Sequence, residues 1–291
     1  MDKPLSIVVF SKDRAAQLDL CLKSISKNLG SLKERCDISI IFTSSSKEFA
    51  SGYERLSELW SSCGFKFEDE NKYNDFNDTL ESLMQGWSKY VLFFTDDDLI
   101  YRNFNHDFEV VEKEFVTTKS LMCISLRLGT NTFVQDQYKN TMCLIPDPVI
   151  SGEEKIKKWK WKKEREDSNF AYPFSLDGHI FESEMAKWVI RNTNGYYNPN
   201  SLEGKAHRIH IVENGCKDFK DDMGCFEKSF VVNTPINRVQ ETCFNGAGKF
   251  FGNTPEELND LFLNGKRLCL ESMDFSTVIG THQEIKLCWE D

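Results

Sequence analysis

Three consecutive carboxylates are the side chains of this sequence best suited to chemistry. Asp96, Asp97 and Asp98 directly follow a run of mostly apolar residues, 90–95. Neighbouring carboxylates repel one another, so it is costly to hold them in a cleft unless a cation lies among them. Mg²⁺ usually takes one or two protein carboxylates, while substrate phosphates and water complete its shell. The sequence therefore predicts a metal–diphosphate site in which Asp96 and Asp98 reach one divalent ion; a solvated acidic turn is the alternative.

A second polar segment follows the first apolar run of the chain. Ser11, Lys12, Asp13 and Arg14 come directly after residues 5–10. Arg14 would stand at the start of a helix, where a cation opposes the helix dipole. A bound phosphate, or an ion pair with Asp97, explains this arginine better than an exposed position does.

The elements that must position these two segments alternate regularly over the first 130 residues. Apolar runs typical of buried strands are separated by apolar stripes at helical spacing. We expect strands at 5–10, 38–43, 65–67, 90–95 and 121–128, and helices over 18–29, 49–63, 76–87 and 104–115. Such alternation predicts an α/β fold with a mostly parallel central sheet flanked by helices. Ligands bind beyond the carboxyl ends of such strands, where both polar segments would lie.

The second half of the chain is less regular. It contains no clear linker, so we expect a single domain over residues 1–291. A segment rich in Lys and Trp, residues 151–170, holds seven basic and five acidic residues, and we expect an exposed, mobile loop or a short helix there. Thr254, Pro255 and Glu257 combine a helix N-cap, a proline at the first helical position and a capping-box glutamate, which predicts a helix start.

Composition narrows the function classes. With 36 Lys and Arg against 46 Asp and Glu, the net charge is −10, which argues against a general nucleic-acid-binding protein. No apolar run approaches the roughly 18 residues of a membrane span. Ten cysteines without a C-x-x-C pair, and no secretory signal, indicate reduced thiols and a cytoplasmic location. The sequence also lacks the glycine-rich dinucleotide fingerprint, the P-loop and the nucleophile elbow of serine hydrolases.

The order of these motifs resembles that of glycosyltransferases of the GT-A fold, most of all the family 2-like inverting group. The resemblance rests on Ser-Lys-Asp-Arg after the first strand and on the Asp-x-Asp after a later apolar strand. It covers most of the chain and is strongest in residues 5–101, with further similar segments at 173–179, 198–203 and 237–240. The resemblance implies a Rossmann-like sheet, a nucleotide-sugar-binding half over residues 1–130 and an elaborated acceptor-binding half over residues 131–291.

The resemblance also implies a donor and a cofactor. The donor would be a nucleotide-diphosphate sugar, with a UDP-sugar favoured, and Mn²⁺ or Mg²⁺ bound by Asp96 and Asp98 would bridge its diphosphate. A late histidine often completes such a metal site, and the candidates are His179, His207 and His210, each of which is otherwise a structural or surface residue. The side chains expected to contact the donor are Ser11, Asp13, Arg14, Thr43, Ser44, Asp96, Asp97, Arg238 and Gln240.

An inverting transferase also needs a general base for the acceptor hydroxyl. Asp177 stands among Phe174, Leu176 and Ile180, and an apolar setting raises the pKa of a carboxylate and suits it to this task. Its alternative role is the N-cap of the following helix. Glu203 is the second candidate for the base, with an ordinary solvated helix position as its alternative.

These observations together favour a metal-dependent inverting glycosyltransferase. It would move a hexosyl or pentosyl group to a hydroxyl of a glycan or glycolipid acceptor, with no nucleic-acid partner and no transmembrane segment. One alternative is a phosphotransferase or phosphohydrolase with Asp96 as nucleophile and Asp98 as acid/base. Another is a non-catalytic module that binds a sugar or nucleotide on the same scaffold.

Overall fold

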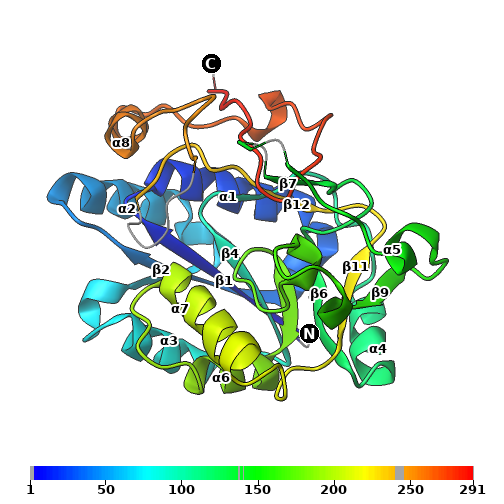
Figure 1. Ribbon diagram of the computed structural model, residues 1–291. Coiled ribbons are helices and arrows are strands. Elements are labelled where there is room, and N and C mark those ends of the chain that lie inside the picture. The colour runs from blue at the N-terminus through cyan, green and yellow to red at the C-terminus, as the bar shows by residue number, and fades with distance from the viewer. Residues whose placement is uncertain (1–2, 137, 140, 240–245, 291) are drawn as a thin grey trace.

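A central eight-stranded sheet organises the computed structural model, which describes residues 3–136, 138–139, 141–239 and 246–290. The strand order is β3-β2-β1-β4-β10-β6-β11-β9 (Figure 1). Strands β1 to β4 are mutually parallel, as are β6 and β11, whereas β10 runs antiparallel to both β4 and β6, and β9 runs antiparallel to β11. The predicted α/β class with a mostly parallel sheet is confirmed. The bounds are β1 Leu5–Lys12, β2 Cys36–Thr43, β3 Lys66–Asp69, β4 Tyr90–Thr95, β6 Leu121–Ser125, β9 Ile156–Lys160, β10 His179–Glu182 and β11 Asp222–Phe226.

Helices cover both faces of this sheet because its central strands are apolar on both sides. In β1, Ile7 and Val9 pack into one core, and Val8 and Phe10 pack into the other. The first core is completed by α1 (Ala15–Asn28), α2 (Lys47–Leu59), α4 (Glu109–Thr117) and α8 (Pro255–Leu263). The second is completed by α3 (Phe76–Met84), α6 (Ser183–Arg191) and α7 (Pro199–Ala206), which lie on the opposite side of the sheet in Figure 1. Two-sided burial of this kind explains the near-continuous apolar runs of the parallel strands.

Short elements bring the end of the chain to the ends of the central strands. Strand β5 (Asp98–Ile100) pairs with β12 (Val231–Asn233) in an antiparallel ribbon, and Asn233 forms a bridge with His282. The C-terminal segment, red in Figure 1, therefore runs beside β12. Apart from short 3₁₀ turns, the other elements outside the main sheet are β7 (Val134–Asp136), β8 (Thr141–Met142), α5 (Asp147–Ser151) and a π-helical turn, His207–Glu213, that continues α7.

The expectation of a mobile loop over residues 151–170 is wrong. Residues 156–160 form β9, at the edge of the sheet, and Trp159 and Trp161 are buried with their indole nitrogens donating to the carbonyls of Phe170 and Lys220. Lysines alternate with these tryptophans, and this period of two is the signal of a half-buried strand. An edge strand carries lysines on its open side, which prevent pairing with other chains. These lysines give the segment the charged composition of an exposed loop, so composition alone does not reveal the strand.

The predicted helix start at Thr254 is confirmed. The Thr254 hydroxyl accepts from the Glu257 backbone, the Glu257 carboxylate accepts from the Thr254 backbone, and α8 follows from Pro255. Within the described ranges, no helix has both the length and the apolar composition needed to cross a bilayer.

Candidate functional site

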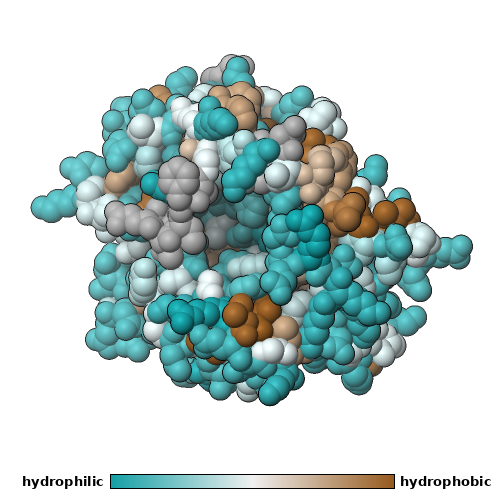
Figure 2. All heavy atoms as spheres, in the orientation of Figure 1, coloured by the Kyte–Doolittle hydropathy of each residue, from teal (hydrophilic) through white to brown (hydrophobic). Residues whose placement is uncertain are grey.

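A cavity of about 1680 Å³ opens beyond the carboxyl ends of the parallel strands. In Figure 2 it is the hollow near the centre of the visible face, with a hydrophilic floor. Because β2, β1, β4 and β10 are neighbours in the sheet, their ends bring segments far apart in the sequence to one place. Eight of the side chains predicted from the sequence line this cavity: Ser11, Arg14, Thr43, Ser44, Asp96, Asp97, Asp177 and Glu203.

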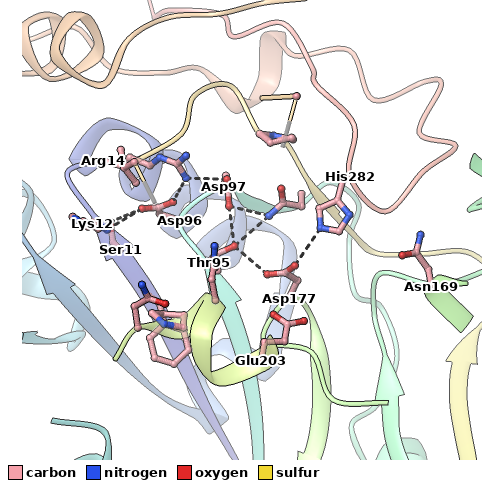
Figure 3. Close-up of a pocket in the computed structure, with 18 of the residues that line it drawn as sticks. Ser11, Lys12, Arg14, Thr95, Asp96, Asp97, Asn169, Asp177, Glu203 and His282 are labelled. Carbon is pink, nitrogen blue, oxygen red and sulfur yellow. Dashed lines mark hydrogen bonds and ion pairs between the residues drawn. The ribbon is translucent and has the colours of Figure 1, made fainter. Parts of the chain in front are cut away.

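Arg14 ties the first strand to the aspartate triplet (Figure 3). Its Nη1 lies 3.0 Å from Asp96 Oδ1 and 2.9 Å from Asp97 Oδ2, and its Nε donates to Asn237 Oδ1 at 2.8 Å. The other oxygen of Asp96 accepts from the Ser11 hydroxyl at 2.8 Å. Arg14 is buried and pairs with Asp97, which was one of the two partners expected for it.

Burial and the charges of the partners together shift the pKa values of Asp96 and Arg14. Burial raises the pKa of Asp96 to about 6, although the Arg14 guanidinium opposes the rise. Burial alone would lower the pKa of Arg14, but the charges of Asp96 and Asp97 raise it above its ordinary value. The arginine therefore stays charged and holds the start of the triplet in place.

Asp97 and two further carboxylates meet at one hydroxyl. Thr95 Oγ1 lies 2.8 Å from Asp97 Oδ1, 3.3 Å from Asp98 Oδ2 and 3.2 Å from Asp177 Oδ1. A hydroxyl donates a single proton, so it satisfies one of these contacts at a time. Burial, and then the charge of Asp177, raise the pKa of Asp98 well above its ordinary value. The Thr95 hydroxyl therefore cannot satisfy all three carboxylates, and Asp98 has no ion pair of its own among the described residues.

Asp98 itself faces inward. It is 1% exposed, accepts from the Thr95 backbone at 2.9 Å and from the Asn233 amide at 3.2 Å, and is absent from the residues that line the cavity. Asp97 is the member of the triplet that lies between Arg14, Asn233 and the open space. The antiparallel ribbon of β5 and β12 produces this arrangement, because Asp98 pairs with Asn233 in it.

Asp177 is held by an arginine and a histidine that the sequence did not single out. Its Oδ2 lies 3.1 Å from Arg127 Nη1 and 3.3 Å from His282 Nε2, and Figure 3 shows the His282 ring directed at this carboxylate. Burial alone would raise the pKa of Asp177, but the hydrogen bond with His282 and the charge of Arg127 lower it to about 2. The sequence predicted a raised pKa for Asp177 because its neighbours in the sequence are apolar, and this prediction is wrong in sign.

The raised pKa that was expected for Asp177 is found at Glu203 instead. This residue lies on α7, whose first turn is capped by Asn198. Burial, followed by the nearby charge of Asp177, raises the pKa of Glu203 to about 7. Glu203 and Asp177 thus lie at one end of the cavity with opposite shifts, the arrangement that often separates acid and base roles in active sites.

The three histidines considered as metal ligands lie elsewhere. His179 is fully buried, with Nδ1 3.6 Å from Cys123 Sγ, and its environment lowers its pKa well below the ordinary value, chiefly through burial. His207 and His210 belong to the π-helical turn, and His210 Nε2 contacts Thr193 Oγ1 at 3.2 Å. His282 is the histidine that lines the cavity. Its only sequence signal was its late position in the chain.

The other predicted donor contacts have different positions. Asp13 adopts a left-handed backbone, φ 55°, and its carboxylate accepts from the Ser45 backbone at 2.7 Å, so it shapes the loop after β2. Arg238 is exposed. Gln240 lies outside the described residues.

The acidic group fits an open divalent-cation site. In the part of the chain that the structure describes, no group of three or more His, Cys, Asp or Glu side chains is arranged to hold a metal ion by itself. A catalytic Mg²⁺ or Mn²⁺ site needs less than that, because one or two carboxylates suffice when substrate phosphates supply further oxygens. The crowding of Asp97, Asp98 and Asp177 around one hydroxyl is the feature that a cation would relieve.

Comparisons with known proteins found structural likeness alone. No protein-family model matches the chain, and no curated protein sequence matches it. Among solved structures, S. aureus TarS in complex with UDP-GlcNAc is 14% identical over 84% of this chain, with a TM-score of 0.46. GalNAc-T7 with UDP, GalNAc and Mn²⁺ is 11% identical over 78%, with a TM-score of 0.47. The mannosyltransferase PcManGT from Pyrobaculum calidifontis, with GDP-Man and Mn²⁺, is 9% identical over 73%, with a TM-score of 0.38.

This chain spans only 62%, 43% and 53% of the lengths of those three proteins, respectively. At such identities and TM-scores, the donor, the acceptor and the metal of this chain have to be argued from its own site.

Proposed function

We propose that this protein is a metal-dependent inverting glycosyltransferase that takes a nucleotide-diphosphate sugar as donor. The observation that carries the proposal is the order of groups along one edge of the sheet. Hydroxyls of Thr43 and Ser44 lie at one end, the Arg14–aspartate group lies in the middle, and Asp177 and Glu203 lie at the other end. An elongated ligand with a polar head, a polyanionic centre and a reactive sugar matches that order.

The polyanionic centre would be bound by a cation together with the arginine clamp. Asp97, the member of the triplet that faces the open space, would hold Mn²⁺ or Mg²⁺, with His282 beside it in place of His179, because His282 lines the cavity, whereas Asp98 faces inward. When bound, the ion would act as a Lewis acid that stabilises the charge developing on the leaving diphosphate. Arg14 positions Asp96 and Asp97 through its two ion pairs.

The acceptor hydroxyl would lose its proton at the opposite end of the cavity. Asp177 is ionised at neutral pH and faces the open space beside His282, so we assign it the role of base. Glu203 is the second candidate, since a base with a pKa near 7 is well matched to neutral pH. In this proposal, residues 1–130 bind the donor and residues 131–291 bind a glycan or glycolipid acceptor.

The remaining readings have less support. A phospho-aspartate enzyme needs an accessible nucleophile, whereas Asp96 is 4% exposed and both its oxygens accept bonds from Ser11 or Arg14. A non-catalytic module would bind the donor without turnover.

The first test is thermal melting with a panel of nucleoside diphosphates and their sugars, with and without Mn²⁺. A ligand that binds only the folded chain stabilises it, by about 2.7 kcal/mol at a hundredfold excess over Kd. This stabilisation raises the melting temperature. We expect a metal-dependent rise with a nucleotide-diphosphate sugar, and release of the nucleoside diphosphate when an acceptor is added. The absence of any rise with metal present would contradict the proposal.

A further inference from the structure

One end of the cavity carries an unused carboxylate. Glu70 lines the cavity directly after β3, far from the carboxylates assigned to the metal and to the base. Phe42 pairs with Asp69 where β2 and β3 lie parallel. The next residue of each strand, Thr43 and Glu70, therefore lies at the same edge of the sheet. Neighbouring strands lie about 4.8 Å apart, which puts Glu70 roughly 19 Å, or four strands, from the β10 edge where Asp177 lies.

Glu70 differs from the acids on either side of it in the sequence. Glu68 accepts from the Tyr73 hydroxyl at 3.1 Å, and Asp69 accepts from the Asn71 backbone at 3.0 Å. The Glu70 side chain has no hydrogen-bond donor among the described residues, and its surroundings offer only the more distant charges of Lys12, Asp75 and Asp69. Because the carboxylate is half-buried and lines the cavity, its oxygens are free to accept a hydrogen bond from a ligand there.

The surroundings of Glu70 limit what that ligand is. Phe10, Ile41 and Phe76 line the same cavity and are buried apolar residues that suit the face of a flat ring. Ser44 and Ser45, on the loop held by Asp13, offer polar groups at the rim. An apolar floor, polar rim groups and a hydrogen-bond-accepting carboxylate are the requirements of a heterocycle that presents an N–H in its plane.

We infer that Glu70 selects the nucleobase of the donor by accepting a hydrogen bond from a ring N–H; this inference rests on the proposed function. Uracil and guanine carry such an N–H next to a carbonyl. Cytosine and adenine carry a lone pair at the corresponding ring nitrogen, which would face the carboxylate and be repelled. The site therefore takes an oxo-base, and guanine, with an adjacent amino group, would use both oxygens of the carboxylate.

The experiment measures the affinities of UDP, GDP, CDP and ADP in the presence of Mn²⁺ by calorimetry, for the wild type and for Glu70→Gln. We expect the wild type to bind UDP or GDP at least tenfold more tightly than CDP and ADP, and the UDP and GDP arms distinguish the two oxo-bases. A hydrogen bond to a charged group is worth roughly 1.5–3 kcal/mol, so Glu70→Gln should weaken the preferred ligand by about tenfold to a hundredfold. CDP should bind the variant more tightly than it binds the wild type, because a glutamine amide can donate to its ring nitrogen.

Two controls separate the possible outcomes. Glu58→Gln removes the same charge from an exposed position on α2 and should leave the ranking of bases unchanged. UDP methylated at the ring nitrogen N3 should bind the wild type as weakly as UDP binds Glu70→Gln, which tests the contact without altering the protein.

An unchanged ranking in Glu70→Gln, or full affinity for the methylated UDP, would overturn the inference while leaving the proposed function standing. If the folded wild type bound none of the four diphosphates, the proposed function would fail, and the inference with it.

Discussion

The two ends of the aspartate triplet differ in how their charges are compensated. At the β1 end, Asp96 accepts from Arg14 and Ser11, and Arg14 is itself enclosed by Asp97 and Asn237. At the β10 end, Asp98 and Asp177 share a single hydroxyl, that of Thr95, with Asp97. At the first end Arg14 pairs with both carboxylates, whereas at the second end Arg127 pairs with Asp177 and Asp98 has no cationic partner among the described residues. The comparison teaches that the first end is a scaffold, and the proposed cation would bind beside the second.

Removal of the arginine tests the scaffold end most strongly. Arg14→Gln leaves the buried carboxylates of Asp96 and Asp97 without their cation, and breaking a buried ion pair costs about 3–5 kcal/mol. We expect a loss of that size in the free energy of unfolding, measured with urea. Arg165→Gln is the matched control, because its ion pair with Asp167 is solvent-exposed and such pairs contribute about 0–1 kcal/mol. Equal losses in the two variants would show that the Arg14 cluster is not a scaffold.

The carboxylate that faces the cavity should affect activity. Asp97→Asn keeps the shape of the side chain and removes a charge from the cavity, so the fold should persist while metal-dependent catalysis falls by at least about a hundredfold. The measurement is donor turnover against Mn²⁺ concentration, with Asp260→Asn on the exposed face of α8 as control. A variant that kept normal metal-dependent turnover would contradict the metal assignment.

The pH dependence of activity distinguishes the two candidate bases. If Glu203 accepts the proton, kcat/KM rises with pH through about 7, where its carboxyl ionises, and Glu203→Gln removes that rise. If Asp177 is the base, activity shows no such rise near 7, because Asp177 is already ionised there. Asp177→Asn and Glu203→Gln, compared at pH 6 and 8, are expected to separate these cases by roughly tenfold.

Glu203 also affects stability with a definite sign. Its folded pKa, about 7, lies above its ordinary value, so the folded chain binds this proton more tightly than the unfolded chain. The contribution of Glu203 to stability therefore falls as pH rises from about 4.5 to about 7. Glu203→Gln should flatten the pH dependence of the melting temperature over that interval.

The smallest effect concerns the loop that the scaffold end supports. Asp13 has a left-handed backbone that Asn adopts almost as readily, and Asn keeps an oxygen that accepts from Ser45. Asp13→Asn should therefore change the free energy of unfolding by less than about 0.5 kcal/mol. Asp13→Ala loses the acceptor and adds strain, which we expect to cost about 1–2 kcal/mol. Urea unfolding of both variants measures the difference, and similar values would show that the Asp13–Ser45 bond does not stabilise the loop.

The sequence predicted the parallel core and the place of the site because both follow from local patterns. Runs such as residues 90–95 are apolar on both faces only when a sheet is covered on both sides. Polar residues directly after two such runs then meet at the same edge. The edge strand β9 escaped notice because six of residues 155–163 are lysines, and the count of charge concealed an alternation of period two.

The sequence by itself determined which acids are present, and it placed Asp96, Asp97 and Asp98 directly after a buried apolar strand, since the pattern of apolar residues reveals that strand. Only the tertiary structure decided the order of the strands and how each acid titrates. Asp177 stands among apolar sequence neighbours and Glu203 among mostly polar or small ones, yet the pKa of the first falls and that of the second rises. The reason is that Arg127 and His282 reach Asp177 from distant parts of the chain. Electrostatic energy depends on distance in space, which local sequence patterns do not record.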